Sequence, residues 1–208
     1  MRLVKHANTM ELIEVYESSK YVHLVLPLME GGDLIKRMMS LKTYNEETAI
    51  KAMRSFLDGL DHCHALNIVH RDLKPENLLL HSKSNDWDMK IADFGLSCIY
   101  KGRGLTVKCG TPGFIAPEIL GDKPYDLKSD VFSAGIILYM LLSGRHPFHA
   151  KNRDALLQAN LQSIIDFDDS KLWGHISDQA KDLVQKMLAK EPDQRISVRE
   201  ALQHPWMN

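Results

Sequence analysis

The stretch from Val69 to Gly95 reads V-H-R-D-L-K-P-E-N-L-L-L, continues through the polar insert H-S-K-S-N-D-W-D, and ends in M-K-I-A-D-F-G. Its two short apolar runs on either side of a polar insert predict a β-hairpin. Asp72 and Asp93 flank this hairpin, and Lys74 and Asn77 lie between the two aspartates. The chain therefore gathers two carboxylates, an amide and a lysine around one small structural unit.

Three motifs follow one another in a fixed order. H-R-D-L-K-P-E-N ends at Asn77, D-F-G begins 16 residues later at Asp93, and A-P-E ends at Glu118. In order and spacing they resemble the protein kinase family, whose serine/threonine members carry Leu-Lys-Pro-Glu-Asn after the first aspartate. The similarity runs from about His6 to Trp206. It implies a protein-kinase-like α+β fold, with a mostly helical large lobe and two strands from the small lobe.

This resemblance implies a role for each central residue. Asp72 would accept the proton of the substrate hydroxyl, Lys74 would lie near the γ-phosphate, and Asn77 and Asp93 would bind Mg²⁺. ATP and Mg²⁺ are thus the implied cofactors, and protein serine or threonine hydroxyls the implied acceptors. Thr111, within G-T-P-G-F-I-A-P-E, supports the serine/threonine assignment. For a single aspartate in a loop, a turn or cap role would be the commoner interpretation.

The first part of the chain predicts two β-strands, at Met10–Glu17 and Tyr21–Met29. The second strand runs into P-L-M-E-G-G-D, which in the resemblance is the hinge between the lobes. Leu26 would be the gatekeeper, and backbone groups of Pro27 and Met29 would bind the adenine edge. An edge strand that ends in a turn is the alternative without the downstream motifs. Other positions implied along the nucleotide site are Asp33, Glu76 and Leu79.

The resemblance implies that residues 1–29 are a remnant of the small lobe and that residues 30–208 form the large lobe. Apolar residues at helical spacing and capping signals predict helices in the large lobe. These are expected at Glu46–Leu66, Leu127–Ser143, Ala155–Ile164, Ser177–Leu188 and Ser197–Gln203, the last with a capping box.

Further residues match positions with architectural roles in the family. The resemblance implies that His70 and Phe94 stack within an apolar spine. It also implies that Glu118 pairs with Arg195 in the interior and that Asp130 holds the backbone of the catalytic loop. We expect these residues to contribute to stability.

Segments after residue 145 resemble the calcium/calmodulin-dependent group of kinases: H-P-F at 146–148, I-S-D-Q-A-K-D-L, E-P-D-Q-R and A-L-Q-H-P-W. Asp33 and Glu76 fall where that group has acidic residues facing an arginine upstream of the phosphorylated site. The implied partners are protein substrates with such an arginine. Regulation by calmodulin or a calcium-binding segment would lie outside these residues.

The loop between D-F-G and A-P-E, residues 96–115, matches the family's activation loop. Its sequence departs from that of many members of the family. Val107 occupies the position of their phosphorylated threonine, and Thr106 precedes it. Arg71, next to the catalytic aspartate, could bind a phosphate on Thr106. Phosphorylation of Thr106 is therefore a hypothesis.

Composition narrows the choice of function classes. A net charge of −1 provides no basic field for nucleic acid or an anionic membrane. Three cysteines without C-x-x-C spacing favour a reducing, intracellular and cytoplasmic environment. The most apolar stretch, Val131 to Leu142, is too short to span a bilayer. H-C-H at 62–64 is a poor metal site, because adjacent helical residues point in different directions.

Residues 1–208 contain no counterpart of the family's glycine-rich loop, β3 lysine or αC glutamate. These groups cover and position the phosphates. We therefore expect very low activity from this chain by itself. One alternative is an inactive short form that binds other proteins. Another is a small-molecule phosphotransferase, against which the long peptide-docking loop argues.

Overall fold

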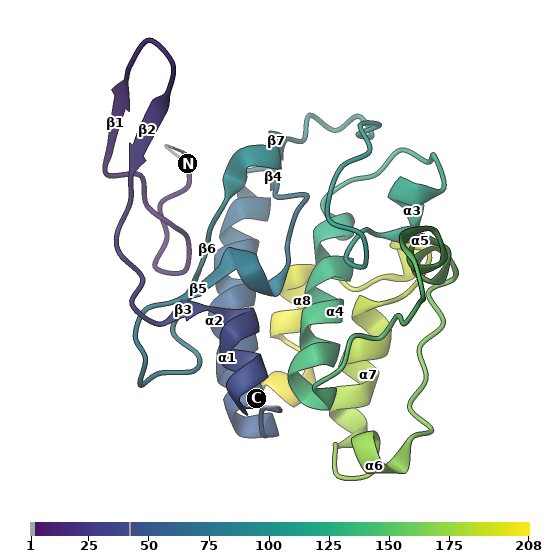
Figure 1. The fold of residues 1–208 in the computed structure, drawn as a ribbon. Helices are drawn as coiled ribbons and strands as arrows, with labels where there is room; N and C mark the ends of the chain where they lie inside the picture. Colours follow the sequence, from purple (N-terminus) through teal and green to yellow (C-terminus); the bar gives the residue numbers. More distant parts are fainter. Residues whose placement is uncertain (1–2, 42) are drawn as a thin grey trace.

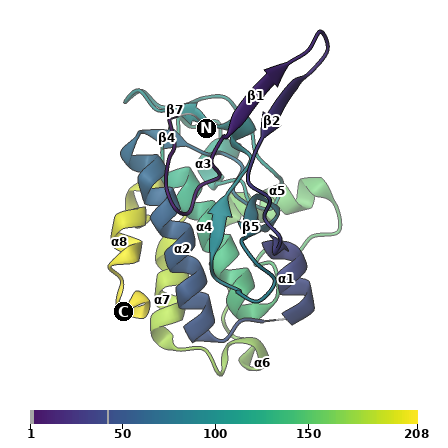
Figure 2. The same cartoon turned by 90° about the vertical axis from the view of Figure 1, so that its left-hand side faces the viewer.

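The computed structural model describes residues 3–41 and 43–208 (Figure 1). Helix α4, Lys128–Ser143, runs through a mainly helical body and is buried along nearly its whole length. Helices α2, Glu46–Ala65, and α7, Asp178–Met187, pack against it. Figure 2 shows the short helix α8, Val198–Leu202, beside α2 near the end of the chain. The predicted α+β class and helical large lobe are confirmed.

The two central helices form for different local reasons. Helix α2 is amphipathic, and its buried residues recur every three or four positions, as at Met53, Phe56 and Leu60. The side chain of Asn45 caps its first turn by accepting a hydrogen bond from the Thr48 amide. Helix α4 is apolar on all sides, which suits a helix surrounded by protein.

Strands β1, Glu14–Glu17, and β2, Val22–Val25, form an antiparallel hairpin that stands away from the helical body (Figure 1). Both are shorter than the sequence predicts. The amide of Met10 donates instead to the carbonyl of Ile91, which draws the preceding segment onto another sheet. Pro27 lacks an N–H and cannot extend the ladder beyond β2.

A second sheet has the strand order β3–β5–β6 and is antiparallel. It comprises Gly32–Asp33, Leu78–Leu80 and Met89–Ile91. The pairing of β5 with β6 confirms the predicted hairpin. A third pair, β4 at Ile68–Val69 with β7 at Cys98–Ile99, was not predicted. It joins the segments that lead into and out of the two central motifs.

The remaining helices are α1, α3, α5 and α6, at Leu34–Leu41, Pro117–Leu120, Arg153–Gln162 and Ser170–Trp173. Predicted helices agree in type, and their ends differ by one or two residues. The capping box of Ser197 and Glu200 is confirmed. Helix α1 is missing from the sequence prediction, although Asp33 accepts a hydrogen bond from the Lys36 amide like an N-cap. In the part of the chain that the structure describes, no helix combines the length and apolarity required to cross a bilayer.

Candidate active site

A buried carboxylate on α4 binds the backbone of the loop that carries Asp72. Asp130 is 1% exposed and accepts hydrogen bonds from the amides of His70 at 2.8 Å and Arg71 at 2.9 Å. Nε2 of His64 lies 3.0 Å from the same carboxylate. Burial favours the neutral acid, but the contacts with His64 and His70 outweigh it and lower the pKa of Asp130. Arg71 has a φ of 69°, a strained conformation that these bonds hold in place.

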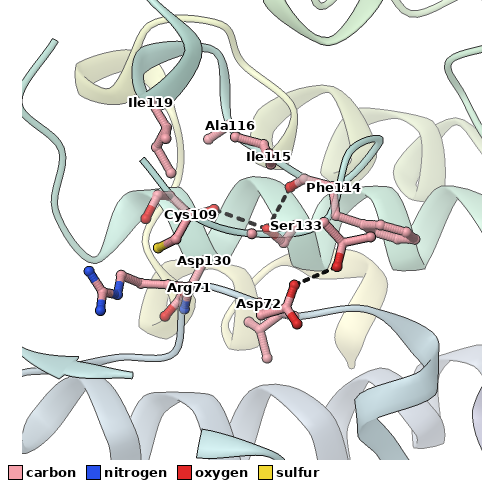
Figure 3. Close-up of a pocket in the computed structure, with 13 residues that line it drawn as sticks. Arg71, Asp72, Cys109, Phe114, Ile115, Ala116, Ile119, Asp130 and Ser133 are labelled. Atoms are coloured by element: carbon pink, nitrogen blue, oxygen red, sulfur yellow. Dashed lines mark hydrogen bonds between the residues drawn. The ribbon is translucent and has the colours of Figure 1, made fainter. Parts of the chain in front are cut away.

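Both oxygens of Asp72 are engaged by residues that the sequence singled out. Oδ1 accepts a hydrogen bond of 2.6 Å from the Thr111 hydroxyl. Oδ2 lies 3.0 Å from Nζ of Lys74, and this ammonium also donates to the Thr111 oxygen at 2.8 Å. The three side chains form one closed network that orients the carboxylate. Figure 3 shows Asp72 directed towards the loop that contains Phe114.

Asn77 connects this network with the second aspartate. The side-chain Nδ2 of Asn77 donates to the backbone carbonyl of Asp72 at 2.8 Å. The backbone carbonyl of Asn77 accepts a hydrogen bond from the Ala92 amide at 2.8 Å. Asp93 follows Ala92 with a φ of 55°, and its Oδ1 accepts from the Gly95 amide at 3.1 Å. Because the amide nitrogen of Asn77 faces Asp72, its side-chain oxygen is left to bind a cation. This oxygen and the exposed Asp93 carboxylate are donors that suit Mg²⁺.

His70 and Phe94 pack against each other with ring centroids 5.0 Å apart in an edge-to-face geometry. Nε2 of His70 lies 2.9 Å from the Ala92 carbonyl, and its Nδ1 lies 3.3 Å from the Asp72 amide. A carbonyl only accepts and an amide only donates, so the ring proton is on Nε2. The imidazole thus links the loops of both aspartates.

Only some of the residues expected at the nucleotide site lie together in the structure. Met10, Met29 and Ala92 form a small buried apolar cluster apart from the main core, and Leu79 packs against it. This cluster directly precedes Asp93, and its three buried members are at most 8% exposed. Leu26, by contrast, is 37% exposed and lies outside the cluster.

The two acidic residues expected along this site differ in their surroundings. Asp33 lies opposite Leu79 in the β3–β5 ladder, and its carboxylate pairs with Lys36 at 2.7 Å. Partial burial opposes ionisation, but the hydrogen bonds from Lys36 prevail and lower the pKa of Asp33. Glu76 is exposed, and among the described residues it has no hydrogen-bonded side-chain partner.

The activation loop is tied to Arg71 by way of Tyr125. The Tyr125 hydroxyl donates to the Val107 carbonyl at 2.6 Å and lies 3.4 Å from a guanidinium nitrogen of Arg71. Nε of Arg71 donates to the Leu96 carbonyl at 2.6 Å. Thr106, the residue before Val107, is exposed. The loop is therefore fixed by contacts that need no phosphate.

Glu118 and Arg195 form a two-pronged ion pair with distances of 2.7 Å and 2.9 Å. Both side chains are buried, and the guanidinium lies over the ring of Phe132 at 5.0 Å. Arg195 also donates to the carbonyls of Ala189 and Lys128. This pair joins α3 to the segment before α8.

Sequence reasoning missed several residues that shape the site. Tyr125, Ser133 and Asn160 bind loop backbone through side chains that carry no motif. Within H-C-H, His64 bonds to Asp130 while the ring of His62 stacks on His6 at 5.0 Å. For Asn160 the sequence offered one signal, because helical spacing places this polar residue among the apolar residues of its predicted helix.

Comparisons with known proteins show which sequences this chain resembles. Residues 1–207 match the family described as protein kinase domain. A calcium/calmodulin-dependent protein kinase type 1 of Macrobrachium nipponense is 39% identical over 208 residues, covering 100% of this chain and 60% of that protein. Calcium-dependent protein kinase 4 of Arabidopsis thaliana is 45% identical over 206 residues, covering 99% of this chain and 41% of that protein. The chain thus spans between two fifths and three fifths of these relatives.

Proposed function

The chain belongs to the protein kinase family, in its calcium/calmodulin-dependent group, and on this premise we propose that it supplies the catalytic residues for transfer of the γ-phosphate of ATP to serine or threonine hydroxyls of proteins, with very low activity from residues 1–208 alone. The observation that carries the proposal is the closed network of Asp72, Lys74 and Thr111. The network brings the oriented Asp72 carboxylate, the Lys74 ammonium and the Thr111 hydroxyl into direct contact. Phosphoryl transfer depends mainly on such positioning and on charge stabilisation.

In this proposal Asp72 is the catalytic base. Its carboxylate accepts the proton of the substrate hydroxyl as the hydroxyl oxygen bonds to phosphorus, and the bond to the leaving ADP oxygen breaks. Lys74 lies 3.0 Å from the same carboxylate and offsets negative charge on the transferred group. Asn77 keeps the loop in shape through its bond to the Asp72 carbonyl.

The residues present also fit the implied cofactors. Asn77 and Asp93 would hold Mg²⁺ through an amide oxygen and a carboxylate. When bound, Mg²⁺ neutralises charge on the phosphates. Backbone groups at Pro27 and Met29 would bind the edge of the adenine ring, and the partly buried Leu79, which packs against the cluster that contains Met29, would contact the face of the ring.

Substrate choice forms a finer part of the proposal. The carboxylates of Asp33 and Glu76 support a preference for an arginine upstream of the acceptor hydroxyl. Asp33 stays ionised because Lys36 lowers its pKa, and a substrate guanidinium could replace the exposed Lys36 ammonium. Calcium or calmodulin dependence and a cytoplasmic location stay predictions.

A phosphotransfer assay with Asp72→Asn tests the central claim. The protein would be incubated with radiolabelled Mg-ATP and a peptide library that varies the residues upstream of serine. We expect a loss of at least about 100-fold in kcat, because the amide cannot accept the proton. Asp61→Asn is the matched control, because Asp61 makes only a surface contact of 3.5 Å with Arg199.

The outcomes separate the competing functions. Activity that Asp72→Asn abolishes and Asp61→Asn preserves supports the kinase. Activity that survives Asp72→Asn contradicts the assigned base. An intact cellular function with Asp72→Asn would favour the protein-binding alternative. Equal use of peptides with and without upstream arginine would overturn the substrate preference.

A further inference from the structure

Three successive carbonyls in the loop after Thr111 are bound by side chains from two helices. Nδ2 of Asn160, on α5, lies 2.7 Å from the Gly113 carbonyl and 3.0 Å from the Ile115 carbonyl. Oγ of Ser133, on α4, donates to the Phe114 carbonyl at 2.8 Å (Figure 3). Helix side chains therefore define the path of this turn.

Asn160 is unusual within its own helix. It is 0% exposed and is the one fully buried residue of α5, all of whose residues are described. Its Oδ1 has no hydrogen-bond partner among the described residues. Burying an unsatisfied amide oxygen is unfavourable, so an apolar side chain would serve helix packing better. The amide is explained by its two donated bonds.

The turn that Asn160 holds is also fixed on its other side. The ring of Phe114 meets that of His146 edge to face, with centroids 5.2 Å apart. Gly113 has a φ of 99°, and a Cβ there would come within 3.1 Å of Nε2 of His146. The turn is thus a thin layer between Asn160 and the imidazole, with Phe114 half-buried on its surface.

We propose that Asn160 is a positioning residue for the peptide substrate: by binding the carbonyls of Gly113 and Ile115, it sets the surface of Phe114 and His146 on which the peptide lies beside the acceptor hydroxyl. This proposal rests on the proposed kinase function. Thr111, which contacts Asp72, begins the same turn, and its carbonyl accepts a hydrogen bond from the Phe114 amide at 3.0 Å. A displaced turn therefore alters the peptide surface and, through Thr111, the orientation of Asp72.

Hydrogen exchange tests the structural step without any need for activity. Asn160→Ala removes both N–H donors, and Asn160→Asp keeps almost the same shape but leaves at most one O–H donor for the two carbonyls. We expect the Phe114 amide to exchange roughly 10- to 100-fold faster in either variant, because buried bonds to the turn are lost. Two variants are used so that a folding failure of one leaves the other informative.

The matched control is Asn152→Ala, which removes the cap of the same helix. Asn152 accepts a hydrogen bond from the Ala155 amide at 2.9 Å and, among the described residues, makes no hydrogen bond to the turn. Its loss should speed exchange in the first turn of α5 and leave Phe114 unchanged. Equal acceleration at Phe114 in all three variants, or none in the Asn160 variants, would overturn the assignment.

Steady-state kinetics tests the consequence for the substrate. In Asn160→Ala, we expect the KM for the peptide to rise roughly tenfold while the KM for ATP stays within about twofold. A parallel rise of both constants would contradict a role specific to the peptide. If the unmodified protein transfers phosphate no faster than Asp72→Asn does, the proposed function fails, whereas the exchange experiment still decides whether Asn160 holds the turn.

Discussion

The hydroxyl of Thr111 lies 2.6 Å from Oδ1 of Asp72, although the two residues are 39 positions apart in the chain. The same hydroxyl accepts a hydrogen bond from Nζ of Lys74, so it both donates and accepts. One hydroxyl thereby links the catalytic loop to the end of the activation loop. The orientation of the Asp72 carboxylate depends on how that second loop is folded.

Replacement of Thr111 should therefore reduce catalysis. In Thr111→Ala the carboxylate of Asp72 loses a charge-assisted bond worth about 1.5–3 kcal/mol, so we expect kcat to fall about 10- to 100-fold. Thr111→Ser retains the hydroxyl and should retain most of the activity. Single-turnover rates at saturating peptide would show the difference. Equal rates for the alanine and serine variants would mean that the hydroxyl does not orient Asp72.

The buried pair of Glu118 and Arg195 should dominate the stability of the helical body. Glu118→Gln leaves the guanidinium without its charged partner in an environment where both side chains are at most 2% exposed. Breaking such a pair costs about 3–5 kcal/mol, and the urea midpoint should fall accordingly. Lys51→Ala removes an exposed pair with Glu47 and should hardly move the midpoint. Similar midpoints for the two variants would contradict the prediction.

Acid should weaken the anchor of the catalytic loop. The pKa of Asp130 is lowered in the fold, since its bonds with His64 and His70 prevail over burial. A lowered pKa means that the ionised carboxylate stabilises the fold above about pH 3.9, the usual value for an unfolded aspartate. This stabilisation is lost as the pH falls towards the lowered value.

The comparison of the unmodified protein with Asp130→Asn isolates this contribution. Urea unfolding between pH 6 and pH 3 should give a difference in stability that is constant above about pH 5 and shrinks below about pH 4. Other carboxylates titrate equally in both proteins and cancel in the difference. A difference that grows towards low pH would contradict the assigned direction.

Order in the activation loop should depend on Tyr125 and not on Thr106. Tyr125→Phe removes the bonds to the Val107 carbonyl and to Arg71, and limited proteolysis should then cut within residues 100–110 roughly tenfold faster. Thr106→Ala should leave the rate unchanged, because Thr106 is exposed and its hydroxyl makes no hydrogen bond in the part of the chain described. Faster cleavage of the alanine variant would show that the Thr106 side chain contributes to the order of the loop.

Local sequence patterns were sufficient for the longer elements. The repeat of Met53, Phe56 and Leu60 specifies one buried face, and this predicted α2 to within one residue of its end. Val131 to Leu142 is apolar on every side, which predicted the buried helix α4. In both cases the information lies within a few turns of the residue concerned.

Elements whose hydrogen bonds come from distant segments were predicted poorly. Strands β4 and β7 pair although each has only two residues, because the chain between them, residues 70–97, folds back and brings the two segments side by side. The predicted first strand began at Met10, whose amide bonds to Ile91 far along the chain. Short segments have too little periodicity to reveal such partners.

The sequence by itself determined the family, the α+β class and the main helices, and it predicted the set of Asp72, Lys74, Asn77 and Asp93, because ordered motifs and helical periodicity are local properties. Only the tertiary structure decided how these groups are held. Asp130, Tyr125 and Asn160 each bind the backbone of a loop remote in sequence. A backbone carbonyl or amide is the same at every residue, so the sequence carries no mark of which ones a distant side chain will bind. Chain topology makes that choice.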